Sequence, residues 1–176
     1  IQPMTNNGDT DQSIDSYLWA LRGSAHYGPA RLLLSTSRTG GGAAMLAPWR
    51  GFLTQEYTRS MTQTDWNADT RSYKAQIDYD AAAHVAGLGV MLSYAYYDRD
   101  PEKTPYQSMT DRLFGNGDTR QWNLDLLYKL SGSWKGAELK ARLMDQNNAL
   151  DGTKADGTSV VDTSNREMRL EANYFF

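Results

Sequence analysis

Seven stretches of the chain alternate apolar and polar residues with a period of two. In residues 16–27, for example, Tyr17 and Trp19 alternate with polar residues such as Arg22 and Ser24. Such alternation predicts β-strands with one apolar face and one water-facing face. The stretches cover residues 16–27, 30–38, 71–80, 85–97, 120–130, 136–144 and 166–176.

The connections between these stretches alternate in length. Those after the first, third and fifth stretches are short, at residues 28–29, 81–84 and 131–133. Outer-membrane β-barrels have short periplasmic turns and long outer loops. The pattern therefore predicts that the last stretch ends at the periplasmic rim. It also predicts outer loops at residues 39–70, 98–119 and 145–165.

Aromatic residues gather at two heights of the predicted apolar face. Tyr and Trp favour boundaries between apolar and wet environments, and barrels carry them in two girdles at the membrane interfaces. A soluble β-sandwich also alternates apolar and polar residues, but it does not predict aromatics at both ends of the apolar face. The expected outer girdle contains Tyr17, Trp19, Tyr73, Tyr94, Tyr96 and Trp122, and the expected periplasmic girdle contains Tyr27, Tyr79, Tyr128, Tyr174 and Phe176.

Composition fits this interpretation. The 176 residues have a formal charge of −3, no Cys and no dense Lys/Arg cluster, so neither disulfides nor nucleic-acid binding is expected. A mean hydropathy of −0.65 suits a barrel in which only alternate residues face lipid. No run of about 18 apolar residues predicts a transmembrane helix. No signal peptide is apparent, so we interpret the chain as mature, processed or incomplete.

The last stretch, Met168-Arg-Leu-Glu-Ala-Asn-Tyr-Phe-Phe176, resembles the terminal signature of outer-membrane proteins. That resemblance implies recognition by the barrel assembly machinery. The whole chain is similar to part of an OprD-like porin. The similarity rests on residues 70–79 after a long loop with residues 60–63, and on residues 87–96, 123–128 and 167–176.

The OprD-like resemblance implies an all-β, transmembrane antiparallel β-barrel of about 16–18 strands. It implies a monomeric or trimeric channel for small carboxylate-bearing solutes. Seven strands are an odd number and would leave two open edges in lipid, so we expect them to be the C-terminal part of a larger single barrel domain. The family's constriction loop lies in the N-terminal half, so its residues are not carried over here.

Parity places charged residues on the face that should line the lumen. The basic ones are Arg22, Arg31, Lys74, Lys129, Lys140, Arg142 and Arg169. The acidic ones are Asp78, Asp125, Glu138, Glu167 and Glu171. Charged rings set pore selectivity, so these residues are candidate pore-lining groups for carboxylates or zwitterions. The alternative is that they only pair with neighbours across strands.

No motif predicts an enzyme. His26 and His84 do not lie beside a candidate Ser nucleophile with an acid partner, and no phosphate-binding loop, metal site or cofactor is predicted. Acidic loops such as residues 151–156 lack the EF-hand spacing for calcium. Residues 43–53 are unusually apolar for an outer loop, which suggests either inward folding or packing against loops or lipopolysaccharide.

The sequence therefore predicts an integral outer-membrane porin for passive, solute-selective diffusion. Its expected partners are outer-membrane lipid, lipopolysaccharide, small solutes and, as one possibility, further copies of itself. The alternative function is structural: the barrel would be a sheath or scaffold for a partner protein in a multi-protein assembly.

Overall fold

The structure is a computed structural model that describes residues 4–5, 11–12, 17–40, 57–61, 68–99, 118–149 and 163–175. Seven strands form one sheet in sequence order, and every neighbouring pair is antiparallel. They are β3 (Leu18–Tyr27), β4 (Ala30–Thr39), β5 (Arg71–Asp80), β6 (Leu88–Asp98), β7 (Asp118–Lys129), β8 (Ala137–Ala149) and β9 (Thr163–Tyr174). The all-β prediction is confirmed.

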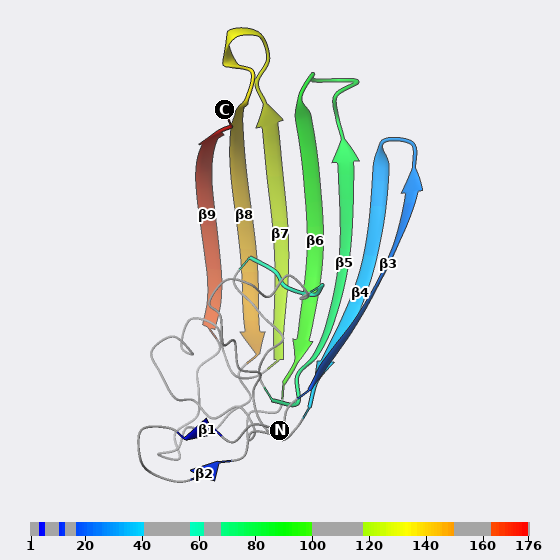
Figure 1. The fold of residues 1–176 in the computed structure, drawn as a ribbon, viewed down its shortest axis with the longest axis vertical. Helices are drawn as coiled ribbons and strands as arrows, with labels where there is room; N and C mark the ends of the chain where they lie inside the picture. Colours follow the sequence, from blue (N-terminus) through cyan, green and yellow to red (C-terminus); the bar gives the residue numbers. More distant parts are fainter. Residues whose placement is uncertain are drawn as a thin grey trace.

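The short connections all lie at one end of the sheet (Figure 1). They join β3 to β4, β5 to β6 and β7 to β8, and the last contains a 3-10 turn, η1 (Gly132–Trp134). A two-stranded hairpin of β1 (Met4–Thr5) and β2 (Asp11–Gln12), which the sequence pattern did not predict, lies at the opposite end. No helix among the described residues is long and apolar enough to cross a membrane.

Burial in this sheet is inverted relative to a soluble domain. Large apolar side chains on one face are exposed, among them Leu21, Leu34 and Leu170. The side chains that the other face buries are mostly polar, including Ser72, Gln121 and Asn123. Because successive side chains in a strand point to opposite faces, the period-two alternation produces this separation directly.

The start of β6 differs from the prediction. Residues 85–87 were expected to belong to the strand, but they form part of a turn, because the amides of His84 and Val85 donate to the carbonyl of Ala81 at 2.9 Å. Gly87 has φ +84°, and a Cβ there would lie 2.2 Å from the Lys129 carbonyl oxygen. Glycine is therefore required at this close approach.

The other strand ends also differ. β8 runs to Ala149 and β9 begins at Thr163, so residues 145–149 and 163–165 are strand where a loop was expected. The alternation stops there because Asp145 and Gln146 place polar groups on both faces, although backbone pairing continues. β9 ends at Tyr174, and Phe176 lies outside the described residues, as does Ser16.

Candidate functional site

The polar face has a neutral half beside the long connections. Its Ser, Thr, Asn and Gln side chains are almost fully buried. They are Ser37, Thr39, Thr70, Ser72, Ser93, Thr119, Gln121, Asn123 and Gln146. Buried polar groups are costly unless they form hydrogen bonds, so this layer must be satisfied from within the protein.

Residues 57–61, which we call the inward segment, supply some of the hydrogen-bond partners of these buried side chains. Its backbone and side chains cover the polar face and contact five strands, β3 to β7. Ser35 Oγ donates to the Tyr57 carbonyl at 2.9 Å, and Lys74 Nζ donates to the Arg59 carbonyl at 2.8 Å. Ser37 Oγ and Thr58 Oγ1 are 2.8 Å apart. A long connection therefore returns to the sheet instead of staying in solvent.

The sequence did not single out the inward segment. Inward folding was suggested for residues 43–53, which lie outside the described residues. The suggestion relied on unusual apolarity, whereas the inward segment is held by polar contacts that look like an ordinary solvated loop in sequence. The only available signal was the presence of hydroxyl residues, Thr58 and Ser60, next to Arg59.

The charged half of the polar face lies nearer the short turns. There Arg31 donates through Nε at 2.9 Å and Nη2 at 2.5 Å to Asp78 Oδ2. These two residues are direct cross-strand partners in the β4–β5 register. Gln76 donates to the other oxygen of Asp78 at 2.8 Å. Both oxygens of this carboxylate are therefore engaged.

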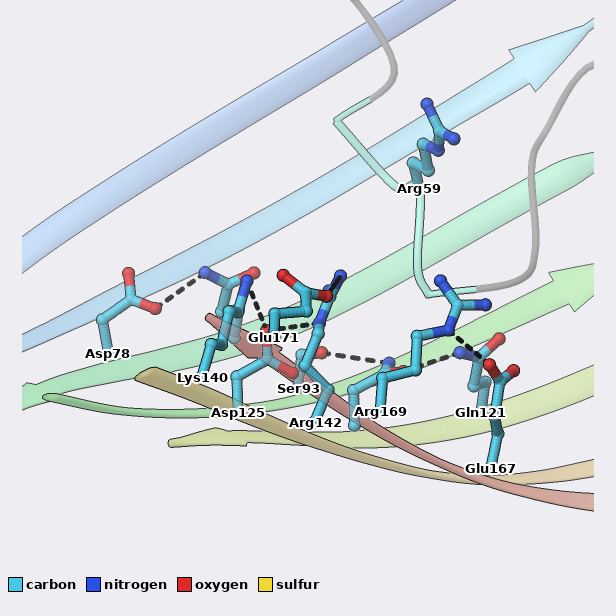
Figure 2. Close-up of polar contacts among 12 residues, drawn as sticks. Arg59, Asp78, Ser93, Gln121, Asp125, Lys140, Arg142, Glu167, Arg169 and Glu171 are labelled. Carbon is cyan, nitrogen blue, oxygen red and sulfur yellow. Dashed lines mark hydrogen bonds and ion pairs between the residues drawn. The ribbon is translucent and has the colours of Figure 1, made fainter. Parts of the chain in front are cut away.

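Asp125 is the buried centre of a second cluster. Its Oδ2 lies 3.0 Å from Arg142 Nε and 3.3 Å from Lys140 Nζ, and Arg142 Nη1 lies 3.8 Å from Glu171 Oε1. Figure 2 shows these side chains together, whereas Arg59 on the inward segment stands apart from them. Asp125 Oδ1 is buried without a hydrogen-bond partner. One carboxylate thus serves two cations from the neighbouring strand.

The remaining candidate residues are dispersed. Lys129 lies 4.0 Å from Glu138, its cross-strand partner. Arg169 pairs with Glu167 on its own strand, not across strands. The Arg22 guanidinium lies over the Tyr57 ring, 4.4 Å from its centroid.

A cavity of about 330 Å³ lies between the inward segment and the sheet. Four basic residues and no acidic residue line it. Lys74 also lines a neighbouring cavity of about 290 Å³ that contains Arg22 and Arg31. The first cavity, which we call the basic cavity, is lined by Arg59, Ser60, Met61, Lys74, Met91, Ser93, Asn123, Arg142 and Arg169. Within the described residues, neither Arg59 nor Lys74 forms an ion pair, and no group of His, Asp or Glu is arranged to hold a metal ion.

The described aromatic residues among those predicted for the girdles, all but Phe176, lie on the opposite, apolar face. Tyr94 and Trp122 are cross-strand partners whose ring centroids are 4.7 Å apart. Tyr79, Tyr94 and Tyr96 are half-buried against neighbours, and the exposed ones are Tyr17, Trp19, Tyr27, Tyr73, Trp122, Tyr128 and Tyr174. Two further exposed aromatics, Trp134 in the turn and Phe175, were not among the predicted girdle residues.

Among known proteins, only solved structures resemble this chain. No family model matches the sequence, and no curated protein sequence matches it. Solved structures do match over nearly the whole chain. Pseudomonas aeruginosa OccK1 (OpdK) aligns with a TM-score of 0.67 and 20% identity over 92% of this chain. The sheet has the fold of an OprD-family porin wall.

Two further porin structures agree. Pseudomonas aeruginosa OccK3 (OpdO) has a TM-score of 0.64 at 21% identity, and Acinetobacter baumannii OccAB4 has 0.66 at 22%, over 93% and 94% of this chain. The chain spans only 40% of OccK3, 38% of OccK1 and 38% of OccAB4. The predicted fold class, seven antiparallel strands with the fold of a porin-type β-barrel wall, is confirmed.

Proposed function

We propose that this sheet forms part of the wall of an integral outer-membrane channel for passive diffusion. The solutes are small, hydrophilic molecules that carry a carboxylate, including zwitterions. The observation that carries the proposal is the basic cavity, which Arg59, Lys74, Arg142 and Arg169 line together with no acidic residue.

An anion would relieve the mutual repulsion of these cations. Two like charges about 4 Å apart repel by roughly 1 kcal/mol even in water, and by more near a protein surface. Arg142 is partly neutralised by Asp125 and Glu171, whereas Arg59 and Lys74 have no ion pair among the described residues. Conduction requires several weak sites in place of one tight site. Because Lys74 lines both cavities, a carboxylate can pass from one basic group to the next.

The named neighbours support the same function. One of them is described as the outer membrane protein OpdK of Pseudomonas aeruginosa, and another structure is of OpdK with vanillate, an aromatic carboxylate. The exposed apolar face of this chain suits contact with membrane lipid, with lipopolysaccharide at the outer rim. We also propose that the last strand is recognised by the barrel assembly machinery.

The test removes two cations of the basic cavity from the complete barrel. In planar bilayers with a salt gradient, Arg142→Ala with Arg169→Ala should lower the anion-to-cation permeability ratio by roughly 5-fold, the effect of about 1 kcal/mol. The matched control is Lys135→Ala with Arg166→Ala, which removes the same charge from exposed sites outside the cavity. It should leave the ratio within experimental error.

Two outcomes would contradict the proposal. If the double variant keeps its selectivity, the basic residues serve only cross-strand pairing. If the unaltered barrel does not conduct, a filled barrel that holds a partner protein becomes the better explanation.

A further inference from the structure

The inward segment is anchored by two side chains that have no access to solvent. Tyr97 on β6 and Gln121 on β7 are both 0% exposed, and both project from the polar face. Tyr97 is the one aromatic residue of the described strands whose side chain lies on the polar face. Ala95, two residues earlier on the same face, is equally buried.

The anchor contacts are specific. The Tyr97 hydroxyl donates to the Thr58 carbonyl at 2.7 Å and lies 2.9 Å from Ser60 Oγ. Ser60 Oγ in turn donates to Gln121 Oε1 at 2.8 Å. The Gln121 amide donates to Asn123 Oδ1 at 2.6 Å, which fixes the direction of its oxygen toward the inward segment.

The anchored segment forms a wall of the basic cavity. Arg59, Ser60 and Met61 line that cavity, while Tyr57 lines the neighbouring one. Figure 2 shows Gln121 below the inward segment, on the sheet side of it. If the segment left the sheet, the two cavities would lose their shared wall and the basic cavity would lose Arg59.

We propose that Tyr97 and Gln121 are positioning residues that hold the inward segment in place and thereby set the ion selectivity of the channel without touching the solute. This inference depends on the proposed channel function. Each lost hydrogen bond should change the ratio of docked to released segment by roughly 2- to 10-fold.

The experiment combines two changes that remove the anchoring polar groups, Tyr97→Phe and Gln121→Leu, in the complete barrel. We expect added current fluctuation from segment movement. We also expect an anion-to-cation permeability ratio about 2- to 5-fold lower, because Arg59 moves beyond screening distance of the cavity. The matched control is Tyr96→Phe, which deletes the neighbouring hydroxyl that donates to Asp118 on the apolar face. That control should behave like the unaltered channel.

A reversible cross-link separates positioning from a general loss of structure. The chain has no Cys, and Ser37 Oγ lies 2.8 Å from Thr58 Oγ1, so Ser37→Cys with Thr58→Cys can form one disulfide. In the Tyr97→Phe, Gln121→Leu background, oxidation should restore the permeability ratio and reduction should lower it again.

The outcomes are distinguishable from failure of the proposed function. If Arg142→Ala with Arg169→Ala changes selectivity but the Tyr97 and Gln121 variants do not, the positioning role is wrong and the channel function stands. If disulfide formation, verified by mass, does not restore the ratio, the role is also wrong.

Discussion

The two faces of the sheet are built on different rules. On the apolar face, the side chains of Leu139, Leu143 and Leu170 are exposed, so the structure makes little demand on which apolar residue stands there. On the polar face, the Tyr97 hydroxyl hydrogen-bonds to the Thr58 carbonyl, and the Asp125 carboxylate pairs with Arg142. In the proposed outer-membrane location, lipid acts as the solvent for the first face, whereas the second must form its hydrogen bonds within the protein. Composition therefore specifies one face, and residue identity specifies the other.

The sharpest test places the same charge change on adjacent residues of opposite faces. Leu170→Arg and Glu171→Gln each add one positive charge to β9. An arginine on the lipid face near the bilayer centre costs about 2–4 kcal/mol. The loss of one partly exposed ion-pair partner costs at most about 1 kcal/mol. Folding into lipid vesicles, followed by urea titration, should show this difference. Equal costs would mean that the face holding Leu170 does not meet lipid.

A smaller effect separates two ion pairs. Asp125→Asn removes the shared partner of Lys140 and Arg142, whose side chains are only 28% and 24% exposed. We expect a loss of about 1–3 kcal/mol in the free energy of unfolding, below the cost for a fully buried pair. The comparison is Asp145→Asn, on the apolar face near the end of β8, which frees Arg166 in a pair that is 57% and 84% exposed. Its cost should not exceed about 0.5 kcal/mol, measured by the same titration.

The smallest effect concerns the aromatic girdle. Trp122→Leu should cost about 0.5–1.5 kcal/mol more than Trp19→Leu, because Trp122 also loses its contact with the Tyr94 ring. Trp19 has no aromatic ring partner among the described residues. Matched unfolding curves of the two variants would measure the difference, and coincident curves would show that the ring contact contributes nothing.

Most of the fold was predictable because alternation, turn length and aromatic placement are local features of the sequence. The strand ends were less predictable. Backbone pairing in β8 continues past Met144, where the alternation of apolar and polar residues has already stopped. The turn at residues 85–87 was missed because the period-two pattern runs through it, whereas the chain reverses through hydrogen bonds to Ala81.

The candidate site was predictable only in part. The alternation of side chains along a strand is enough to place Arg142 and Asp125 on one face. It does not show which acidic residue pairs with which basic residue. Cross-strand pairing was the alternative considered for the charged residues, but Glu167, for instance, pairs with Arg169 on its own strand. The inward segment was out of reach, because its position depends on contacts with strands far along the chain, such as Ser60 with Gln121.

The outermost strands, β3 and β9, have one consequence for assembly. Neither pairs with the other in the described chain, so each presents a row of backbone amides and carbonyls at its outer side. In hydrocarbon each such unsatisfied group costs several kcal/mol. In the proposed barrel, an incomplete ring of strands would therefore be unstable in the bilayer. We expect membrane insertion to be coupled to the final strand pairing that closes the ring. Mutations that slow the final strand pairing should accumulate assembly intermediates outside the hydrocarbon, even where the finished barrel is stable.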